Sequence, residues 1–145
     1  MARVQEILRR KNAVLRTIAP EASVHAAIET MVQHGIGSLV VMESDTMVGI
    51  FTERDVLKRV AMTGMPTRMT AVRQVMTRDV VTVDPDASVE DCMEKMSQRR
   101  IRHLPVSQSG KVVAMISIGD LVQHCLSERE VEVRHLTDYI AGRYS

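Results

Sequence analysis

Two short segments pair a hydroxyl residue with an acidic residue three positions later, and they offer the best prospect of chemistry in this sequence. Thr52 precedes Asp55 in one segment, and Ser117 precedes Asp120 in the other. Each hydroxyl residue ends an apolar run, and each acid falls where a helix is predicted to begin. A helix N-terminus attracts phosphate through its free N–H groups and its dipole. A carboxylate one turn further on can accept the hydroxyls of a ribose, so the pattern is typical of recognising a ribose and a phosphate.

The same pattern has a purely structural interpretation. A hydroxyl residue followed by an acid three positions later resembles a capping box, which stabilises a helix start by about 1 kcal/mol without any ligand. Taken locally, the spacing favours this cap. Whether the two segments also bind a ligand depends on what the rest of the chain places around them.

The two segments belong to a long internal repeat. Residues 17–60 and 82–125 align without a gap at a constant offset of 65, and 14 of the 44 aligned positions are identical. A repeat at a fixed period predicts two copies of one structural unit. We expect a pseudo-twofold axis between the copies and a cleft where they meet.

Both copies predict the same order of elements, β-α-β-β-α. An extended piece ends in proline, since the residues before a proline avoid helical backbone. Ser23 and Ser88 are the predicted N-caps of the following helix. Gly35 predicts the end of this helix in the first copy, whereas Arg100 stands at the same position in the second. Two apolar runs around a polar turn then predict a hairpin, and the second helix begins at the hydroxyl–acid segment.

The predicted fold class is α+β, built as an α/β-type repeat with an additional C-terminal helix. One unit is expected over residues 7–63, a linker with a lead-in strand over 64–79, a second unit over 80–126 and the extra helix over 127–145. Ser127 and Glu130 predict a new capping box at the start of that extra helix. The second helix of each unit has a predicted apolar stripe, formed by Val56, Leu57, Val60 and Ala61 in one copy and by Leu121, Val122, Cys125 and Leu126 in the other.

Composition argues against several classes of function. The net charge of +1 and the three aromatic residues among 145 give no field and few stacking surfaces for nucleic acid, so no nucleic-acid partner is expected. The sequence has neither an apolar run of membrane-spanning length nor an N-terminal signal core, which predicts a cytoplasmic protein without a membrane contact. It also has no metal-ligand spacing, nucleophile elbow or Gly-rich dinucleotide turn, so we expect no metal and no enzyme activity.

Taken together and in order, the repeated features resemble a tandem pair of cystathionine-β-synthase (CBS) domains, a Bateman module, of the stand-alone bacterial type. The resemblance covers about residues 7–126. It rests on the paired Thr-x-x-Pro starts, on Gly37-Ser38-Leu39-Val40-Val41 and Arg102-His103-Leu104-Pro105-Val106, and on the two hydroxyl–acid segments.

The resemblance implies a non-catalytic regulatory, energy-sensing module. Such a module binds an adenosyl ligand (AMP, ADP, ATP, NAD(H) or S-adenosylmethionine) in the cleft between its two units and signals to a client protein. It also implies a homodimer. The alternative is a structural or oligomerisation module whose two sites are vestigial and unoccupied.

The resemblance also implies roles for individual positions. Asp55 and Asp120 would hold ribose, and Thr52 and Ser117 would contact phosphate. The adenine would be walled, and hydrogen-bonded by backbone groups, by Thr17, Ile18, Gly37, Ser38 and Leu39 in the first copy and by Thr82, Val83, Arg102, His103, Leu104 and Pro105 in the second.

The two copies differ where the variable end of a ligand would lie. Arg54 is a natural phosphate partner in the first segment, but Gly119 occupies its position in the second. The second site would therefore use Arg102 and His103 for anionic groups. These differences predict two related but unequal sites.

Overall fold

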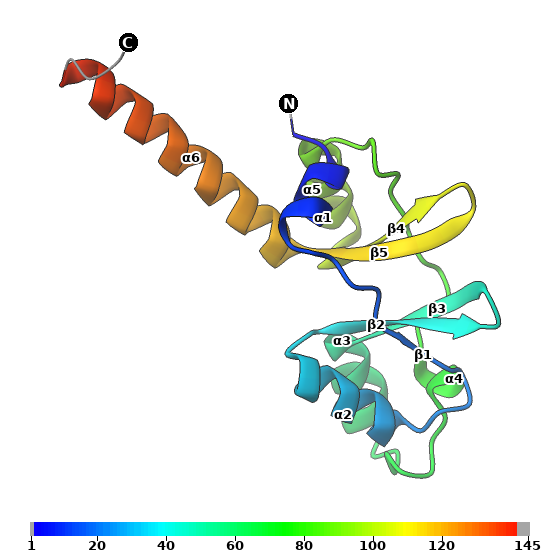
Figure 1. The fold of residues 1–145 in the computed structure, drawn as a ribbon. Helices are drawn as coiled ribbons and strands as arrows, with labels where there is room; N and C mark the ends of the chain where they lie inside the picture. The colour runs from blue at the N-terminus through cyan, green and yellow to red at the C-terminus, as the bar shows by residue number, and fades with distance from the viewer. Residues whose placement is uncertain (1, 142–145) are drawn as a thin grey trace.

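The computed structural model describes residues 2–141, which form two units of similar architecture and a long C-terminal helix (Figure 1). The first unit comprises β1 (Thr17–Ile18), α2 (Val24–His34), β2 (Ser38–Glu43), β3 (Thr46–Thr52), α3 (Glu53–Asp55) and the π-helical segment η1 (Val56–Ala61). The second comprises α5 (Val89–Arg99), β4 (His103–Gln108), β5 (Lys111–Ser117) and α6 (Ile118–Ile140). Two short helices, α1 (Val4–Arg10) and α4 (Val72–Val75), lie ahead of the two units in the sequence. The predicted fold class is confirmed.

The first helix of each unit begins and ends as the repeat requires. The Ser23 hydroxyl accepts a hydrogen bond from the Ala26 N–H at 3.0 Å, and that of Ser88 accepts one from the Asp91 N–H at 3.0 Å. Both predicted caps are therefore confirmed. Gly35 ends α2 with a φ of 61°, and Arg100 ends α5 in the same left-handed conformation with a φ of 55°. An arginine thus adopts a backbone conformation that usually favours glycine.

The hairpins of the two units match, but the first strands do not. β2 pairs antiparallel with β3, and β4 with β5, with a bulge after Val41 and after the equivalent Val106. β1 pairs in parallel with β2, and the Val40 N–H donates to the Arg16 carbonyl at 3.1 Å. In the second unit this strand is reduced to a bridge between Val83 and Val106. Pro105 stands at the position of Val40 and has no N–H to donate, which explains the shorter pairing.

The segment that precedes each unit packs into the other unit. Val4 of α1 is buried in the core of the second unit, and Val72 of α4 is buried in the core of the first. The Val4 N–H donates to the Ala87 carbonyl and the Val72 N–H to the Ala22 carbonyl, both at 2.9 Å. The two units are therefore tied together by exchanged helices. The residue boundaries inferred from the sequence for the two units stay a prediction.

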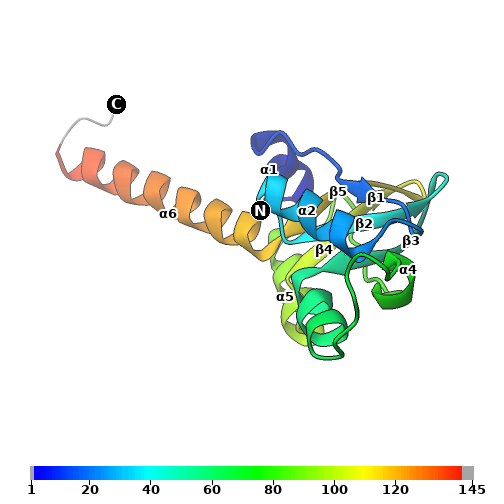
Figure 2. The ribbon, with the colours of Figure 1, turned by 90° about the horizontal axis from the view of Figure 1, so that it is seen from below.

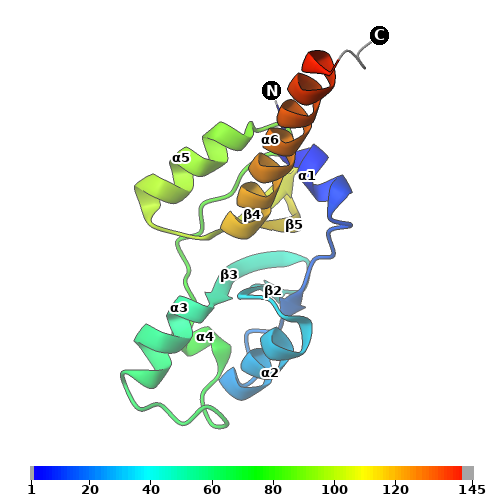
Figure 3. The same cartoon turned by 90° about the vertical axis from the view of Figure 1, so that its left-hand side faces the viewer.

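The C-terminal helix is present, but the start predicted for it is wrong. α6 runs without a break through Ser127, from the hydroxyl–acid segment of the second unit to Ile140. No proline or glycine interrupts residues 120–140, and a helix already nucleated propagates at little cost. Figures 2 and 3 show α6 leading away from the two units for most of its length. Residues 142–145 of the predicted segment lie outside the described residues.

The predicted apolar stripes of the second helices are mostly wrong. Val60 and Leu121 are buried, but the other predicted stripe residues are half-buried or exposed, Leu57 at 64% and Leu126 at 57%. Each helix therefore packs on its sheet along a narrower edge than its apolar pattern suggests. Within residues 2–141, every helix is too short or too polar to cross a membrane.

Candidate functional site

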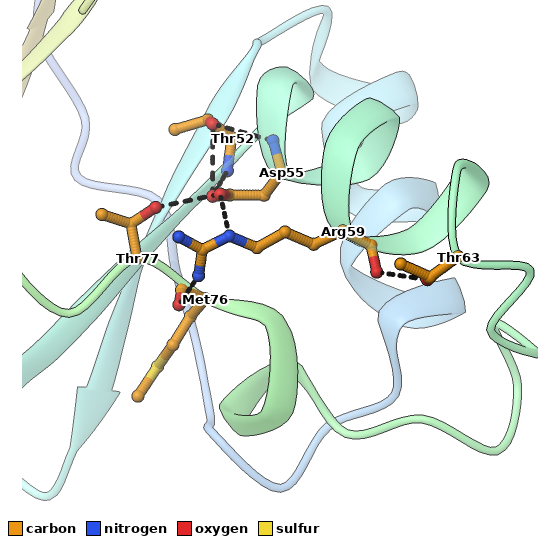
Figure 4. Close-up of polar contacts among 6 residues, drawn as sticks. All are labelled: Thr52, Asp55, Arg59, Thr63, Met76 and Thr77. Atoms are coloured by element: carbon orange, nitrogen blue, oxygen red, sulfur yellow. Dashed lines mark hydrogen bonds and ion pairs between the residues drawn. The ribbon is translucent and has the colours of Figure 1, made fainter.

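The first hydroxyl–acid segment forms the predicted capping box (Figure 4). The Thr52 N–H donates to Asp55 Oδ2 at 3.0 Å, and the Asp55 N–H donates to Thr52 Oγ1 at 3.3 Å. The Asp55 side chain is only 6% exposed. The structural interpretation of this segment is thus confirmed, and it places a buried carboxylate at the start of α3.

Further groups surround the Asp55 carboxylate. The Thr77 hydroxyl donates to Oδ1 at 2.9 Å, and Arg59 Nε lies 3.7 Å from the same oxygen. Arg59 also donates to the Met76 carbonyl at 2.9 Å, so its guanidinium bridges the carboxylate and the segment after α4 (Figure 4). Thr77 itself is held by two backbone hydrogen bonds with Ile50, at 2.9 and 2.8 Å. A buried carboxylate needs such partners, because burial of an unpaired charge is costly.

The second hydroxyl–acid segment has the same box and a different partner. The Ser117 N–H donates to Asp120 Oδ2 at 2.8 Å, and the Asp120 N–H donates to Ser117 Oγ at 3.2 Å. The Lys11 ammonium forms an ion pair with Asp120 Oδ2 at 2.7 Å. The Asp120 side chain is 21% exposed, so this carboxylate is closer to the surface than Asp55.

The segments predicted to wall the ligand begin beside the two boxes. The Gly37 carbonyl accepts from the Glu53 N–H at 3.0 Å, and the Arg102 carbonyl accepts from the Ile118 N–H at 2.8 Å. Gly37 has little room, because a Cβ there would collide with the Glu53 carboxylate and lie 3.3 Å from His103 Nε2. A glycine at this position therefore lets side chains from both units approach each other.

A cavity of about 340 Å³ lies where the two units meet. Polar residues from both units line it. Five of the predicted site residues line it, namely Thr52, Arg54, Asp55, Arg102 and His103. Seven further residues complete its wall: Ile50, Glu53, Leu57, Lys58, Thr77, Arg100 and Ile101.

The sequence could have indicated some of these additional wall residues but not others. Lys58 lies one helical turn beyond Arg54, so the helix start could have indicated it. Arg100 belongs to the basic run that ends at Arg102. Thr77 lies 22 positions from its partner Asp55, and no local pattern connects the two residues.

Cationic side chains outnumber acidic ones around this cavity. Its wall contains four cationic residues, Arg54, Lys58, Arg100 and Arg102, and two acidic ones, Glu53 and Asp55. Arg54 Nη1 donates to the Arg100 carbonyl at 2.7 Å and so joins the two units across the cavity. A guanidinium has five N–H donors, which leaves capacity for an anionic ligand. The arrangement suits a molecule that carries both neutral hydroxyls and negative charge.

His103 lies close to charged groups of both units. Burial lowers the pKa of its imidazole below the ordinary value, and the nearby Arg102 and Lys11 act in the same direction. Glu53 and Asp120 oppose the shift by attracting a proton. Burial is the largest of these effects, so the ring favours its neutral form at neutral pH and can offer one donor and one acceptor.

The remaining predicted site residues do not line this cavity. The side chains of Leu39, Leu104, Pro105, Ser38 and Val83 are buried, and Thr17 lies exposed at the edge of β1. Ile18, Thr82 and Ser117 are half-buried. The Val83 N–H and the Pro105 carbonyl are already joined by a hydrogen bond of 3.0 Å. A role for any of these residues in a ligand site stays a prediction. No group of three or more His, Cys, Asp or Glu side chains within residues 2–141 is placed to hold a metal ion.

Comparison with known proteins defines the class to which this arrangement belongs. A family model described as CBS domain matches the chain twice, over residues 4–62 and 72–127. The chain belongs to the CBS-domain family, as a tandem pair. CBS domain-containing protein CBSX3, mitochondrial, of Arabidopsis thaliana is 37% identical over 127 residues. That match covers 84% of this chain and 62% of the Arabidopsis protein.

Solved structures show the same architecture. The CBS-domain containing protein ATU1752 from Agrobacterium tumefaciens is 36% identical with a TM-score of 0.81, and the match covers 85% of this chain and 98% of that one. A CBS-CP12 protein from bloom-forming cyanobacteria, described as hexameric, is 30% identical with a TM-score of 0.73. That match covers 84% of this chain and 70% of the cyanobacterial one.

Proposed function

We propose that this chain is a non-catalytic regulatory module that binds an adenine nucleotide in the cavity between its two units. The observation that carries the proposal is the composition of the cavity wall. The Thr52 hydroxyl and the Asp55 carboxylate, at the start of α3, line the cavity together with cationic residues of both units. The cavity volume of about 340 Å³ is within the usual range for small-molecule sites. Ribose hydroxyls would use the Asp55 carboxylate, and the phosphate would meet Arg54, Lys58 and Arg102.

The ligand would act by holding the two units in one arrangement. The cavity wall comes from both units, and Arg54 already joins them through the Arg100 carbonyl. A bound phosphate would compete for the same guanidinium and change how the units are connected. A ligand shifts such an equilibrium only by its different affinity for the two arrangements, and a client protein would read the shift. No metal is required, and the candidates are AMP, ADP, ATP and NAD(H).

A thermal-shift panel on nucleotide-stripped protein tests the proposal. A ligand that binds the folded state adds about 2.7 kcal/mol of stability at 100 times its dissociation constant. We expect at least one of AMP, ADP, ATP and NADH to raise the melting temperature, with adenosine giving a smaller effect because it lacks a phosphate. If none of them raises it at millimolar concentration, the proposal is wrong.

One observation favours the alternative, a structural module with unoccupied sites. Both Asp55 oxygens already have partners within the chain, in Thr52, Thr77 and Arg59. The box can therefore stabilise α3 without a ligand. Mass spectrometry of small molecules released from freshly purified, denatured protein separates the two proposals. A stoichiometric adenine nucleotide supports the sensor, whereas its absence together with a silent thermal-shift panel supports the structural module.

We further propose that the module works as a homodimer. A groove of about 480 Å³ lies between α2 and the α3–η1 segment of the first unit, lined by Ile28, Met31, Val32, Gly35, Ile36, Glu53, Val56 and Leu57. Val32 is 75% exposed and Leu57 64%, and apolar side chains grouped in this way mark an interaction surface. Light scattering coupled to size exclusion should give twice the chain mass, and Leu57→Lys should move the mass towards that of one chain. A monomeric mass for the unmodified protein would contradict this proposal.

A further inference from the structure

The carboxylates of Asp55 and Asp120 each accept one more hydrogen bond from a side chain outside their capping box, and the two donors differ in charge. In the first unit the donor is the neutral hydroxyl of Thr77, at 2.9 Å from Asp55 Oδ1. In the second unit it is the ammonium of Lys11, at 2.7 Å from Asp120 Oδ2. Both donors come from the exchanged segments, just after α4 and just after α1 respectively. Equivalent segments of the two units therefore supply the donor, but the donor group differs.

Backbone geometry explains why a lysine takes this place. After α4, the chain approaches β3 closely enough for Thr77 to exchange two backbone hydrogen bonds with Ile50. A Cβ at Gly49 would lie 2.7 Å from the Thr77 carbonyl oxygen, so this approach needs a glycine. The second copy has Ala114 at that position. There the carbonyl of Met115, the equivalent of Ile50, accepts instead from the Lys11 ammonium at 3.0 Å.

The cation that neutralises the carboxylate also has a different origin. In the first unit Arg59 lies four residues after Asp55, with its Nε 3.7 Å from Oδ1. The equivalent residue in the second unit is His124, whose side chain is 6% exposed and whose Nδ1 has no hydrogen-bond partner. Lys11 is thus the cation that pairs with Asp120. The lysine side chain is 33% exposed and stands on a flexible stem, so it can move without disturbing a core.

We propose that Lys11 determines which ligands the second site accepts, by requiring them to carry an anion. This inference rests on the proposed function and extends it to a second site at Asp120, which does not line the cavity described above. A ribose whose two hydroxyls use both oxygens of Asp120 must take over Oδ2, which now accepts from Lys11 and from the Ser117 N–H. The displaced ammonium then needs a new anionic partner close by, which the phosphate of a nucleotide provides and a nucleoside does not. The first site has no such requirement, since its donor Thr77 is neutral and Arg59 keeps its hydrogen bond to the Met76 carbonyl. The second site is therefore selective for phosphorylated ligands.

Calorimetric titrations of adenosine and AMP into nucleotide-stripped protein test this selectivity. Lys11→Met keeps the length of the side chain and removes its charge. We expect Lys11→Met to bind one more adenosine per chain than the unmodified protein. We also expect the preference of the second site for AMP over adenosine to fall at least tenfold. Lys111→Met, which removes an exposed lysine at the start of β5, is the matched control and should behave as the unmodified protein.

A second pair of variants shows at which of the two sites Lys11 changes the selectivity. Asp55→Asn weakens the first site, so binding in this background reports mainly on Asp120. We expect Asp55→Asn to take up AMP but not adenosine, and Asp55→Asn with Lys11→Met to take up both. An unchanged adenosine stoichiometry and an unchanged preference in the Lys11→Met proteins would overturn the role of Lys11, although AMP bound by the unmodified protein would leave the proposed function standing. Failure of the unmodified protein to bind any of adenosine, AMP, ADP, ATP and NADH would overturn both. Circular dichroism of each variant confirms that it is folded.

Discussion

At the scale of single residues, the hydroxyl–acid segments show how one geometry can serve as a cap and as a site. Both capping boxes predicted from the sequence are present, with Asp55 more deeply buried than Asp120. The donors that complete the carboxylates, Thr77 and Lys11, were not predicted. Lys11 lies 109 positions from Asp120 in the sequence, and only the exchanged packing of α1 brings them together. Local patterns predict caps well because caps are local, whereas partners from another unit leave no such signal.

The imidazole of His103 makes the free energy of unfolding depend on pH. Since burial lowers the pKa of its imidazole, the unfolded chain binds a proton more readily than the folded one. As the pH falls below the ordinary histidine value of about 6.5, the unfolded state is protonated first and the free energy of unfolding decreases. The decrease stops below the pKa of the folded state.

We therefore expect His103→Gln to reduce the loss of stability on acidification. Urea unfolding of both proteins between about pH 7.5 and pH 5.5 measures the effect. The charged groups that act on the ring, namely Glu53, Asp120, Arg102 and Lys11, are unchanged in the variant. An equal decrease in the two proteins would show that His103 does not carry this pH dependence.

At the scale of elements, the repeat predicts helix starts better than helix ends and packing faces. Ser23 and Ser88 cap their helices as expected. The apolar stripes of the second helices suggested a wider buried face than the structure has, and α6 continues past Ser127. A hydrophobic period shows which side chains share a helix face, but it does not show how much of that face is covered within the same chain.

The ends of α2 and α5 give a matched pair of variants. Gly35 and Arg100 occupy equivalent left-handed positions, with φ of 61° and 55°. A side chain in this conformation costs about 1 kcal/mol or more, partly offset by the chain entropy that glycine loses on folding. We expect Gly35→Ala to lower the free energy of unfolding by about 1 kcal/mol and Arg100→Gly to raise it by a few tenths to about 1 kcal/mol.

Chemical denaturation without added nucleotide measures both changes. The Arg100 carbonyl that accepts from Arg54 is retained in Arg100→Gly, so the connection across the cavity survives the substitution. A loss of stability in Arg100→Gly would mean that its side chain contributes more than its backbone conformation costs.

At the scale of the whole molecule, the internal repeat predicts two units and a meeting point between them, and the structure has both. The exchange of α1 and α4 between the units was not predicted, because short amphipathic helices fit either core by composition alone. The different residues that the exchanged segments contribute make the two helix-start sites unequal. They supply a neutral hydroxyl to one carboxylate and an ammonium to the other. The divergence between the copies thus lies in the connecting segments as much as in the repeat itself.

The central claim is that the carboxylate of Asp55 binds the ribose of a nucleotide in the cavity between the units. The most direct measurement is a calorimetric titration of nucleotide-stripped protein with the nucleotide that gives the largest thermal shift. Asp55→Asn is compared with Asp45→Asn, which alters an exposed carboxylate in the hairpin turn between β2 and β3. A hydrogen bond to a charged group contributes about 1.5–3 kcal/mol. We therefore predict at least a tenfold loss of affinity at the first site in Asp55→Asn, with the second site still binding, and no loss at either site in Asp45→Asn. Equal affinity of the two variants, or no binding by the unmodified protein, would contradict the account.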